Sequence, residues 1–171
     1  YCPLCNSAIL FSRELDGRTL SFGNTGALYE SAMVMYDRET HSEWYQIGGL
    51  ALNGPLEGTR LPVLPVSLTT WGQWLERQPD TIVLSRNTGF DRPYELNTYI
   101  SRGYHEPHSP PGFPVSISNT TLPPKEKIVG LQVGDVFKAY PVSVLAGTTT
   151  QDMIGATTLE LVGDETGQSA E

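Results

Sequence analysis

The chain is 171 residues long, which is enough for one domain with a hydrophobic core. Its net charge is -8 and its 11 basic residues are scattered along the sequence, so a concentrated positive surface for nucleic acid or for an anionic membrane is not expected. No apolar run approaches the ~20 residues that a membrane-spanning helix needs, so no transmembrane segment is predicted.

The first half of the chain is predicted to consist of short strands and turns. The 17 Gly and 13 Pro residues separate many short apolar runs, which is typical of antiparallel strands joined by tight turns. We therefore expect a mainly β fold, α+β by strict count, with antiparallel hairpins, two short helices and a long irregular loop. The strands predicted in this half lie at residues 8–13, 19–22, 32–36, 43–47, 50–54 and 60–64.

The second half contains the clearest helix, predicted at residues 70–78. A Thr cap precedes it, Pro79 ends it, and Trp71 and Trp74 share one face, which we expect to belong to the core. The elements predicted after it are a buried strand at 81–85, a long polar loop at 86–124, a hairpin at 128–140, a short helix from Pro141 and a strand at 157–161.

The chain begins at Tyr1 and not at a Met. We therefore expect it to be part of a longer protein, or to have lost a leader segment. Its cellular location has to be inferred from other features.

Several motifs along the chain resemble one protein family. They are Tyr-Cys-Pro-Leu-Cys-Asn-Ser-Ala at residues 1–8, Leu-Ser-Phe-Gly at 20–23, Met-Val-Met-Tyr-Asp-Arg-Glu-Thr at 33–40, Gly-Pro-Leu-x-Gly-Thr-Arg-Leu at 54–61, Leu-Pro-Pro-Lys-Glu at 122–126 and Lys-Ala-Tyr-Pro at 138–141. Together they resemble the bacterial and archaeal "domain of unknown function 3179" family over nearly the whole chain. The resemblance implies a prokaryotic, extracytoplasmic protein, periplasmic or on the cell surface, since members of that family are often exported or lipid-anchored.

The resemblance also indicates an internal repeat within a single domain spanning residues 1–171. Family members usually carry an Ala-Tyr-Pro segment, a short helix and a strand before the Cys-x-x-Cys. A similar unit begins near residue 128 of this chain, and it places Asp164 and Gly167 where Cys2 and Cys5 stand. If Asp and Gly build the same turn, the fold does not need the two cysteines there, which favours a functional role for them.

Both cysteines of the chain, Cys2 and Cys5, form a Cys-Pro-x-Cys motif at its beginning. Three interpretations remain open: a metal site, a thiol–disulfide exchange site, and a structural pair, either a disulfide or two reduced thiols. A metal site needs further ligands, and His105 and His108 in the long loop would supply them. Such a ligand set predicts that the bound metal is zinc or copper.

A second group of candidate residues lies around the predicted turn after residue 36. Asp37, Arg38, Trp44 and Gln46 could hold a polar ligand or cofactor by hydrogen bonds and stacking. The simpler alternative is a hairpin turn in which Asp37 caps the backbone and Arg38 pairs with Glu39.

Two functions follow from these observations, and the sequence leaves open whether the protein is an enzyme. The first is a non-catalytic extracytoplasmic module that binds a protein partner, or serves as a subunit of a larger, membrane-associated assembly. In this module Cys2 and Cys5 would be a structural clip or would bind a metal ion. The second is a metal-dependent or thiol–disulfide redox enzyme centred on the cysteines. The enzyme requires Cys2, Cys5 and the hairpin from Asp37 to Gln46 to meet at one open cavity.

Overall fold

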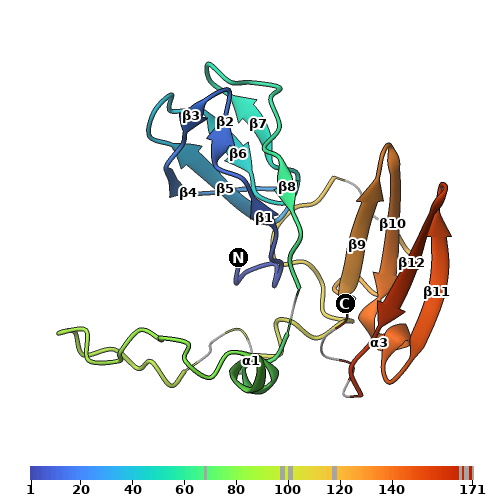
Figure 1. Cartoon of the computed structure of the whole chain (residues 1–171). Coiled ribbons are helices and arrows are strands. Elements are labelled where there is room, and N and C mark those ends of the chain that lie inside the picture. Colours follow the sequence, from blue (N-terminus) through green and yellow to red (C-terminus); the bar gives the residue numbers. More distant parts are fainter. Residues whose placement is uncertain are drawn as a thin grey trace. The chain divides into compact units, whose positions relative to one another are not determined.

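A computed structural model describes residues 1–67, 69–96, 99, 102–116, 119–165, 167 and 170. The described residues form a mainly β structure with two short helices, which confirms the predicted fold class (Figure 1). The chain divides into two compact units. The first unit comprises residues 1–66 and 103–125, and the second unit comprises residues 67–102 and 126–171.

The predicted single domain with an internal repeat stays a prediction. Residues 166, 168, 169 and 171, at the end of the second copy, lie outside the described residues. The second unit does contain all the described chain from residue 128 on, where the second copy is predicted to begin.

The first unit is built on a four-stranded antiparallel sheet. Its strands pair in the order β4-β5-β6-β7, and the pairing of β4 with β5 contains a register shift between Asn24 and Leu28. Four very short strands form two further pairs, β1 with β8 and β2 with β3. The bounds are β1 Leu10–Phe11, β2 Glu14–Leu15, β3 Arg18–Thr19, β4 Phe22–Tyr29, β5 Ala32–Asp37, β6 Glu43–Tyr45, β7 Leu50–Asn53 and β8 Val63–Leu64.

The core of the first unit lies against this sheet. Leu20, Trp44, Ala51 and Leu61 form its buried cluster, and the ring of Phe22 packs edge-on against Trp44 with centroids 6.0 Å apart. Because residues alternate between the two faces of a strand, Ala32 and Val34 of β5 are buried while Met33 and Met35 are only partly so. Trp44 thus packs in one cluster with Leu20, which precedes the sheet, and Leu61, which follows it.

The helix predicted at residues 70–78 is present in the second unit as α1, Trp71–Arg77. Thr70 and Gln73 form a reciprocal capping box at its N-terminus, in which each side chain binds the other's backbone N–H. Its Trp residues were expected in the core, and this expectation is wrong. Trp71 and Trp74 are 52% and 41% exposed, and none of the helix residues is buried.

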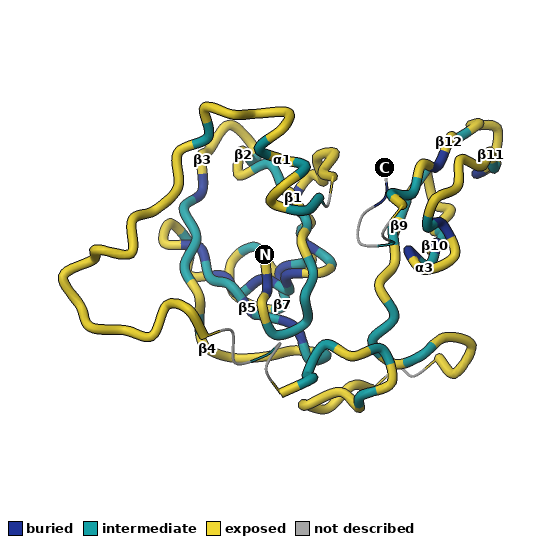
Figure 2. The backbone as a smooth tube through the Cα atoms, turned by 90° about the horizontal axis from the view of Figure 1, so that it is seen from below, coloured by how far each residue is buried: buried dark blue, intermediate teal, exposed yellow. Residues whose placement is uncertain are grey.

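The predicted buried strand at residues 81–85 is also wrong. This segment has no strand structure, and Ile82 and Leu84 are 94% and 98% exposed. A strand is stable only when a neighbour pairs with its backbone, and the described strands of the second unit pair only within their own hairpins. Residues 82–96 are exposed throughout, as the yellow colour of that stretch in Figure 2 indicates.

The hairpin predicted at 128–140 and the short helix after Pro141 are confirmed. The strand predicted at 157–161 is also present, and it pairs with a strand that the sequence analysis missed. A buried cluster of Tyr140, Leu145, Ile154, Leu161 and Ala170 holds these elements together. The bounds are β9 Ile128–Val133, β10 Val136–Pro141, α3 Val142–Leu145, β11 Thr149–Ile154 and β12 Thr157–Val162.

Candidate functional site

The two cysteines lie on a short closed loop at the beginning of the first unit. The backbone N–H of Cys2 donates to the carbonyl of Ser7 at 2.9 Å, and the N–H of Ser7 donates back to Cys2 at 3.4 Å. Asn6 has a φ of 50°, a left-handed conformation that Asn tolerates better than most residues. This closure turns the chain back on itself and brings the two thiols close together.

Both thiols are free, and their environments differ. Cys2 is 2% exposed, whereas Cys5 is half-buried. Burial by itself would raise the pKa of Cys2, but hydrogen bonds from the Cys5 side chain and from the backbone N–H groups of Cys5, Met33 and Leu4 outweigh it and lower that pKa. Burial raises the pKa of Cys5, and the neighbouring Cys2 raises it further. The negative charge is therefore stabilised on the buried sulfur.

Two polar side chains complete what we call the thiol cluster, defined as Cys2, Cys5, Ser7 and Gln46. Ser7 Oγ lies 2.9 Å from Cys5 Sγ and donates to Gln46 Oε1 at 3.2 Å. Cys5 Sγ also donates to Gln46 Oε1, at 3.9 Å. Gln46 is 3% exposed, and its backbone N–H donates to Met33 of β5. Its Nε2 has no hydrogen-bond partner among the described residues.

Of the four ligand-binding candidates, Gln46 is the one that accepts a hydrogen bond from a cysteine among the described residues. Asp37 is fully buried, and its carboxylate accepts from Thr40 N at 2.5 Å, Thr40 Oγ1 at 2.8 Å and Trp44 Nε1 at 2.8 Å. Asp37 thus caps the turn, as the simpler alternative predicted. The proposed binding role of these residues stays a prediction.

The charged residues of the same turn bind the start of β4 and the residue just before it. Arg38 Nη1 donates to the carbonyl of Phe22 at 2.6 Å, and its guanidinium lies over the Tyr36 ring. Glu39 accepts from the backbone and side chain of Ser21 at 2.8 and 2.6 Å. These contacts replace the expected pairing of Arg38 with Glu39.

The predicted histidine ligands are placed differently from each other. His105 Nε2 lies 2.8 Å from the carbonyl oxygen of Pro3, so this imidazole touches the cysteine loop, while His108 is exposed. Among the described residues, no group of three or more His, Cys, Asp or Glu side chains is arranged to hold a metal ion. The structure therefore brings together the two cysteines of the predicted metal set, with one histidine beside their loop.

The sequence analysis missed Ser7 as a member of the cluster. Strand periodicity could not have found it, because Cys5 and Ser7 are joined through a turn in which Asn6 has a φ of 50°. Neither composition nor motif would have revealed that Nε2 of Gln46 lacks a partner among the described residues, because this depends on the packing of β5 and of the residues after β6.

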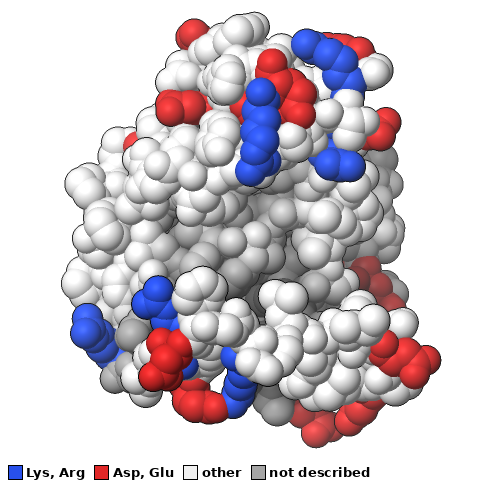
Figure 3. Space-filling model, turned by 90° about the vertical axis from the view of Figure 1, so that its left-hand side faces the viewer, with Lys and Arg blue, Asp and Glu red and all other residues white. Residues whose placement is uncertain are grey.

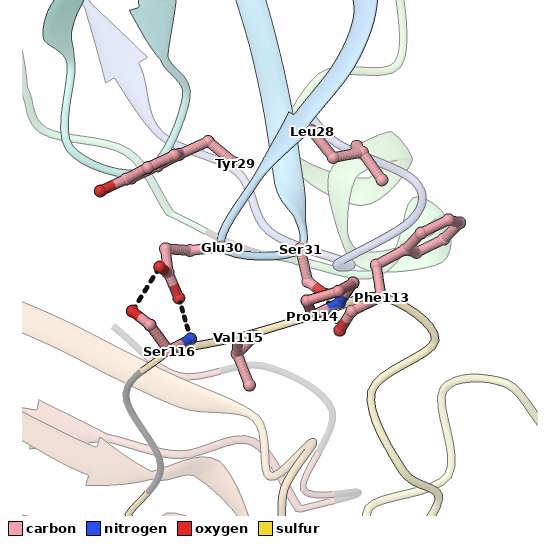
Figure 4. Close-up of a pocket in the computed structure, with 8 residues that line it drawn as sticks. All are labelled: Leu28, Tyr29, Glu30, Ser31, Phe113, Pro114, Val115 and Ser116. Atoms are coloured by element: carbon pink, nitrogen blue, oxygen red, sulfur yellow. Dashed lines mark hydrogen bonds between the residues drawn. The ribbon is translucent and has the colours of Figure 1, made fainter.

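The first unit also has a hollow of about 470 Å³ that no motif predicted. Figure 4 shows it between the β4–β5 turn and residues 113–116, where the Glu30 carboxylate accepts from the backbone and hydroxyl of Ser116. Ser31 Oγ donates to the carbonyl of Phe113 at 2.7 Å. Glu30 and Ser31 both have positive φ, of 49° and 58°, so these contacts hold a strained turn.

On the face drawn in Figure 3, Lys and Arg side chains lie near Asp and Glu side chains and form no broad basic patch. Within the described part of the chain, no helix is long and apolar enough to cross a membrane.

Fold and site together define a small, mainly β protein with a pair of free, adjacent thiols. A family model described as "Protein of unknown function (DUF3179)" matches residues 1–171, and the chain belongs to this family. This confirms the resemblance seen in the sequence motifs. No curated protein and no solved structure matches the chain.

Proposed function

We propose that the chain is a non-catalytic extracytoplasmic module whose Cys2–Cys5 pair holds a soft metal ion, zinc or copper. It would serve as a partner-binding part or subunit of a larger assembly. The observation that carries the metal role is a pair of free cysteines on one closed loop, with Cys5 Sγ 2.9 Å from Ser7 Oγ and 3.9 Å from Gln46 Oε1. Thiolates are the form in which Cys binds metals, and hydrogen bonding lowers the pKa of the Cys2 thiol without a helix.

The same geometry gives less support to thiol–disulfide exchange. Exchange needs an accessible thiolate as nucleophile. Here the thiol with the lowered pKa is Cys2, which is 2% exposed, and the accessible thiol, Cys5, has a raised pKa. The residues after Cys5 form a bridge and then the strand β1, so the helix N-terminus that activates such cysteines in exchange enzymes does not follow Cys5.

The non-catalytic role is supported by the position of the predicted hairpin. An enzyme centred on the cysteines would need Asp37 and Trp44 at an open cavity with them, yet both side chains are fully buried and bonded to each other. Partner binding is supported by apolar side chains that stand in solvent, such as Ile82, Leu84 and Phe90. The extracytoplasmic location rests on the family resemblance.

Elemental analysis of the purified protein, together with a count of free thiols, tests the metal role. We expect one equivalent of zinc or copper per chain, lost in Cys2→Ser and in Cys5→Ser because each variant removes one of the two sulfur ligands. His41→Asn is the matched control, since it removes a histidine that has a φ of 59°, a conformation that Asn accepts.

Two outcomes would contradict this proposal. Absence of metal with no free thiol would identify the pair as a structural disulfide. Absence of metal with two reactive thiols would favour the exchange enzyme. Loss of metal in His105→Ala or His108→Ala, with His41→Asn unaffected, would show that the histidines complete the site.

A further inference from the structure

We infer that the ion held at the thiol cluster is Cu(I), bound by the two cysteine sulfurs alone, and that Gln46 is a positioning residue which donates a hydrogen bond to the metal-bound sulfur of Cys5. This inference rests on the proposed function and names the metal and its coordination. Binding would release both thiol protons: two Cys–SH groups and one Cu(I) give a bis-thiolate complex of net charge −1 and two protons.

The number of donor atoms favours Cu(I) over zinc. The cluster offers two sulfurs and the neutral oxygens of Ser7 and Gln46, and the described residues provide no third His, Cys, Asp or Glu in a position to complete a metal site. Structural zinc is almost always bound by four such ligands. Cu(I) is a soft ion that prefers thiolates, and two sulfurs suffice for it because it is stable in linear two-coordinate complexes.

The packing around Cys2 favours a low coordination number as well. Cys2 is 2% exposed, and the backbone bonds between Cys2 and Ser7 close its loop, which leaves its sulfur little room for further ligands. His105, the nearest imidazole of the predicted set, has its Nε2 on the carbonyl of Pro3. Additional ligands would have to enter beside Cys5, where Ser7 and Gln46 already lie.

The amide of Gln46 is the second, independent observation. Its Oε1 accepts from Cys5 and Ser7, which suits a protonated thiol, but this orientation leaves Nε2 buried without a partner among the described residues. A buried donor without a partner is unfavourable. Once Cys5 has lost its proton, the side-chain amide of Gln46 can exchange the positions of its oxygen and nitrogen. Nε2 then points to the Cys5 thiolate, and Ser7 Oγ, which can accept as well as donate, remains a hydrogen-bond partner of the amide. The anionic bis-thiolate complex thus gives the amide N–H group of Gln46 an acceptor, while Oε1 moves to the position that Nε2 occupies in the reduced protein.

Competition titrations of the reduced 171-residue chain under anaerobic conditions test the inference. Cu(I) is titrated against a chromophoric Cu(I) chelator, and Zn(II) against a zinc indicator. We expect one Cu(I) per chain, bound at least ~100-fold more tightly than Zn(II), with X-ray absorption showing sulfur neighbours and no nitrogen. Equal or tighter binding of Zn(II), or a nitrogen neighbour that disappears in His105→Ala, would overturn this inference and leave the proposed metal role intact. Binding of neither ion would overturn both.

Variants of Gln46 test its positioning role. Gln46→Glu keeps the size of the side chain but removes the donor, so we expect Cu(I) affinity to fall ~10-fold while the ratio of one ion per chain is kept. Gln151→Glu, at an exposed position of β11, is the control for the change in charge and should leave the affinity unaltered. Because Gln46→Glu puts a carboxylate at a buried position, Ser7→Ala, which removes a neutral neighbour of Cys5, is measured alongside, and a ~2- to 5-fold loss is expected. Unchanged affinity in both cluster variants would overturn the role of the polar pair.

Discussion

Replacement of Asp37 by Ala is expected to lower the free energy of unfolding of the first unit by about 4 kcal/mol. The carboxylate of Asp37 is fully buried and accepts hydrogen bonds from Thr40 and from the indole N–H of Trp44. Without it, these donors remain buried and unpaired, and the core residue Trp44 loses its tie to the turn after β5. Urea unfolding followed by tryptophan emission measures the change, because Trp44 is the buried indole of the chain while Trp71 and Trp74 are substantially exposed.

Two further variants separate the network from the charge. Asp37→Asn keeps one acceptor oxygen and should lose about 2 kcal/mol. Asp16→Asn changes an exposed Asp in a turn residue with a φ of 49°, which Asn adopts readily, and should alter stability by less than about 0.5 kcal/mol. A loss below about 1 kcal/mol in Asp37→Ala would contradict the structural role and would revive Asp37 as a ligand-binding residue.

The stability that Asp37 contributes should also depend on pH. Burial alone would raise the pKa of Asp37, but its hydrogen bonds from Trp44 and Thr40 outweigh burial and lower the pKa below its ordinary value. Because the unfolded chain then binds the proton more readily than the folded one, the contribution is complete above the ordinary Asp pKa of about 3.9 and is lost as the pH falls through the folded value.

Unfolding curves measured from pH 6 down to pH 2 test this dependence. The difference in stability between the wild type and Asp37→Asn should be constant at the upper end of the range and should shrink in the acid. A difference that stayed constant to pH 2 would show that Asp37 is not the group responsible. Asp16→Asn again serves as the control, with a curve parallel to that of the wild type.

The elements that sequence patterns predicted correctly are those that local interactions decide. The capping box of Thr70 and Gln73 fixes the start of α1, and the turn at Gly134 joins two strands that are adjacent along the chain. In the same way, the capping of a turn by Asp37 needs only residues three positions away. Such features depend on chain neighbours, so a single sequence contains the information for them.

The predictions that failed depend on partners that are distant along the chain. Residues 81–85 have strand-forming side chains, but the described hairpins leave them no strand to pair with. Trp71 and Trp74 share a helix face, yet that face lies in solvent. At the site, Cys2 and Cys5 were evident from their spacing. The convergence of Gln46 on Cys5, across 41 positions of sequence, is a property of the packed fold.

Replacement of Gly163 by Ala is expected to lower the stability of the second unit by about 3 kcal/mol. A Cβ at this position would lie 2.0 Å from the carbonyl oxygen of Leu145 and 2.4 Å from its carbonyl carbon. Both are backbone atoms at the end of α3, so no rotation of a side chain can relieve the overlap. The N–H of Gly163 also donates to Thr148 at 2.9 Å, and Leu145 is part of the buried cluster. The methyl group would therefore push α3 away from β12 and open the core of the unit.

Hydrogen exchange of the backbone amides in β11 and β12 measures this effect, since their protection reports the opening of the second unit. We expect the protection of these amides to fall about 100-fold in Gly163→Ala, which corresponds to most of the predicted loss. Gly130→Ala is the matched control, because Gly130 lies within β9 and an added Cβ there meets no atom within 4 Å. That variant should keep or slightly increase protection, since Ala restricts the unfolded chain more than Gly does. Equal protection in the two variants would show that α3 moves away from β12 at little cost, and the packing of Leu145 against Gly163 would then not be what holds this unit together.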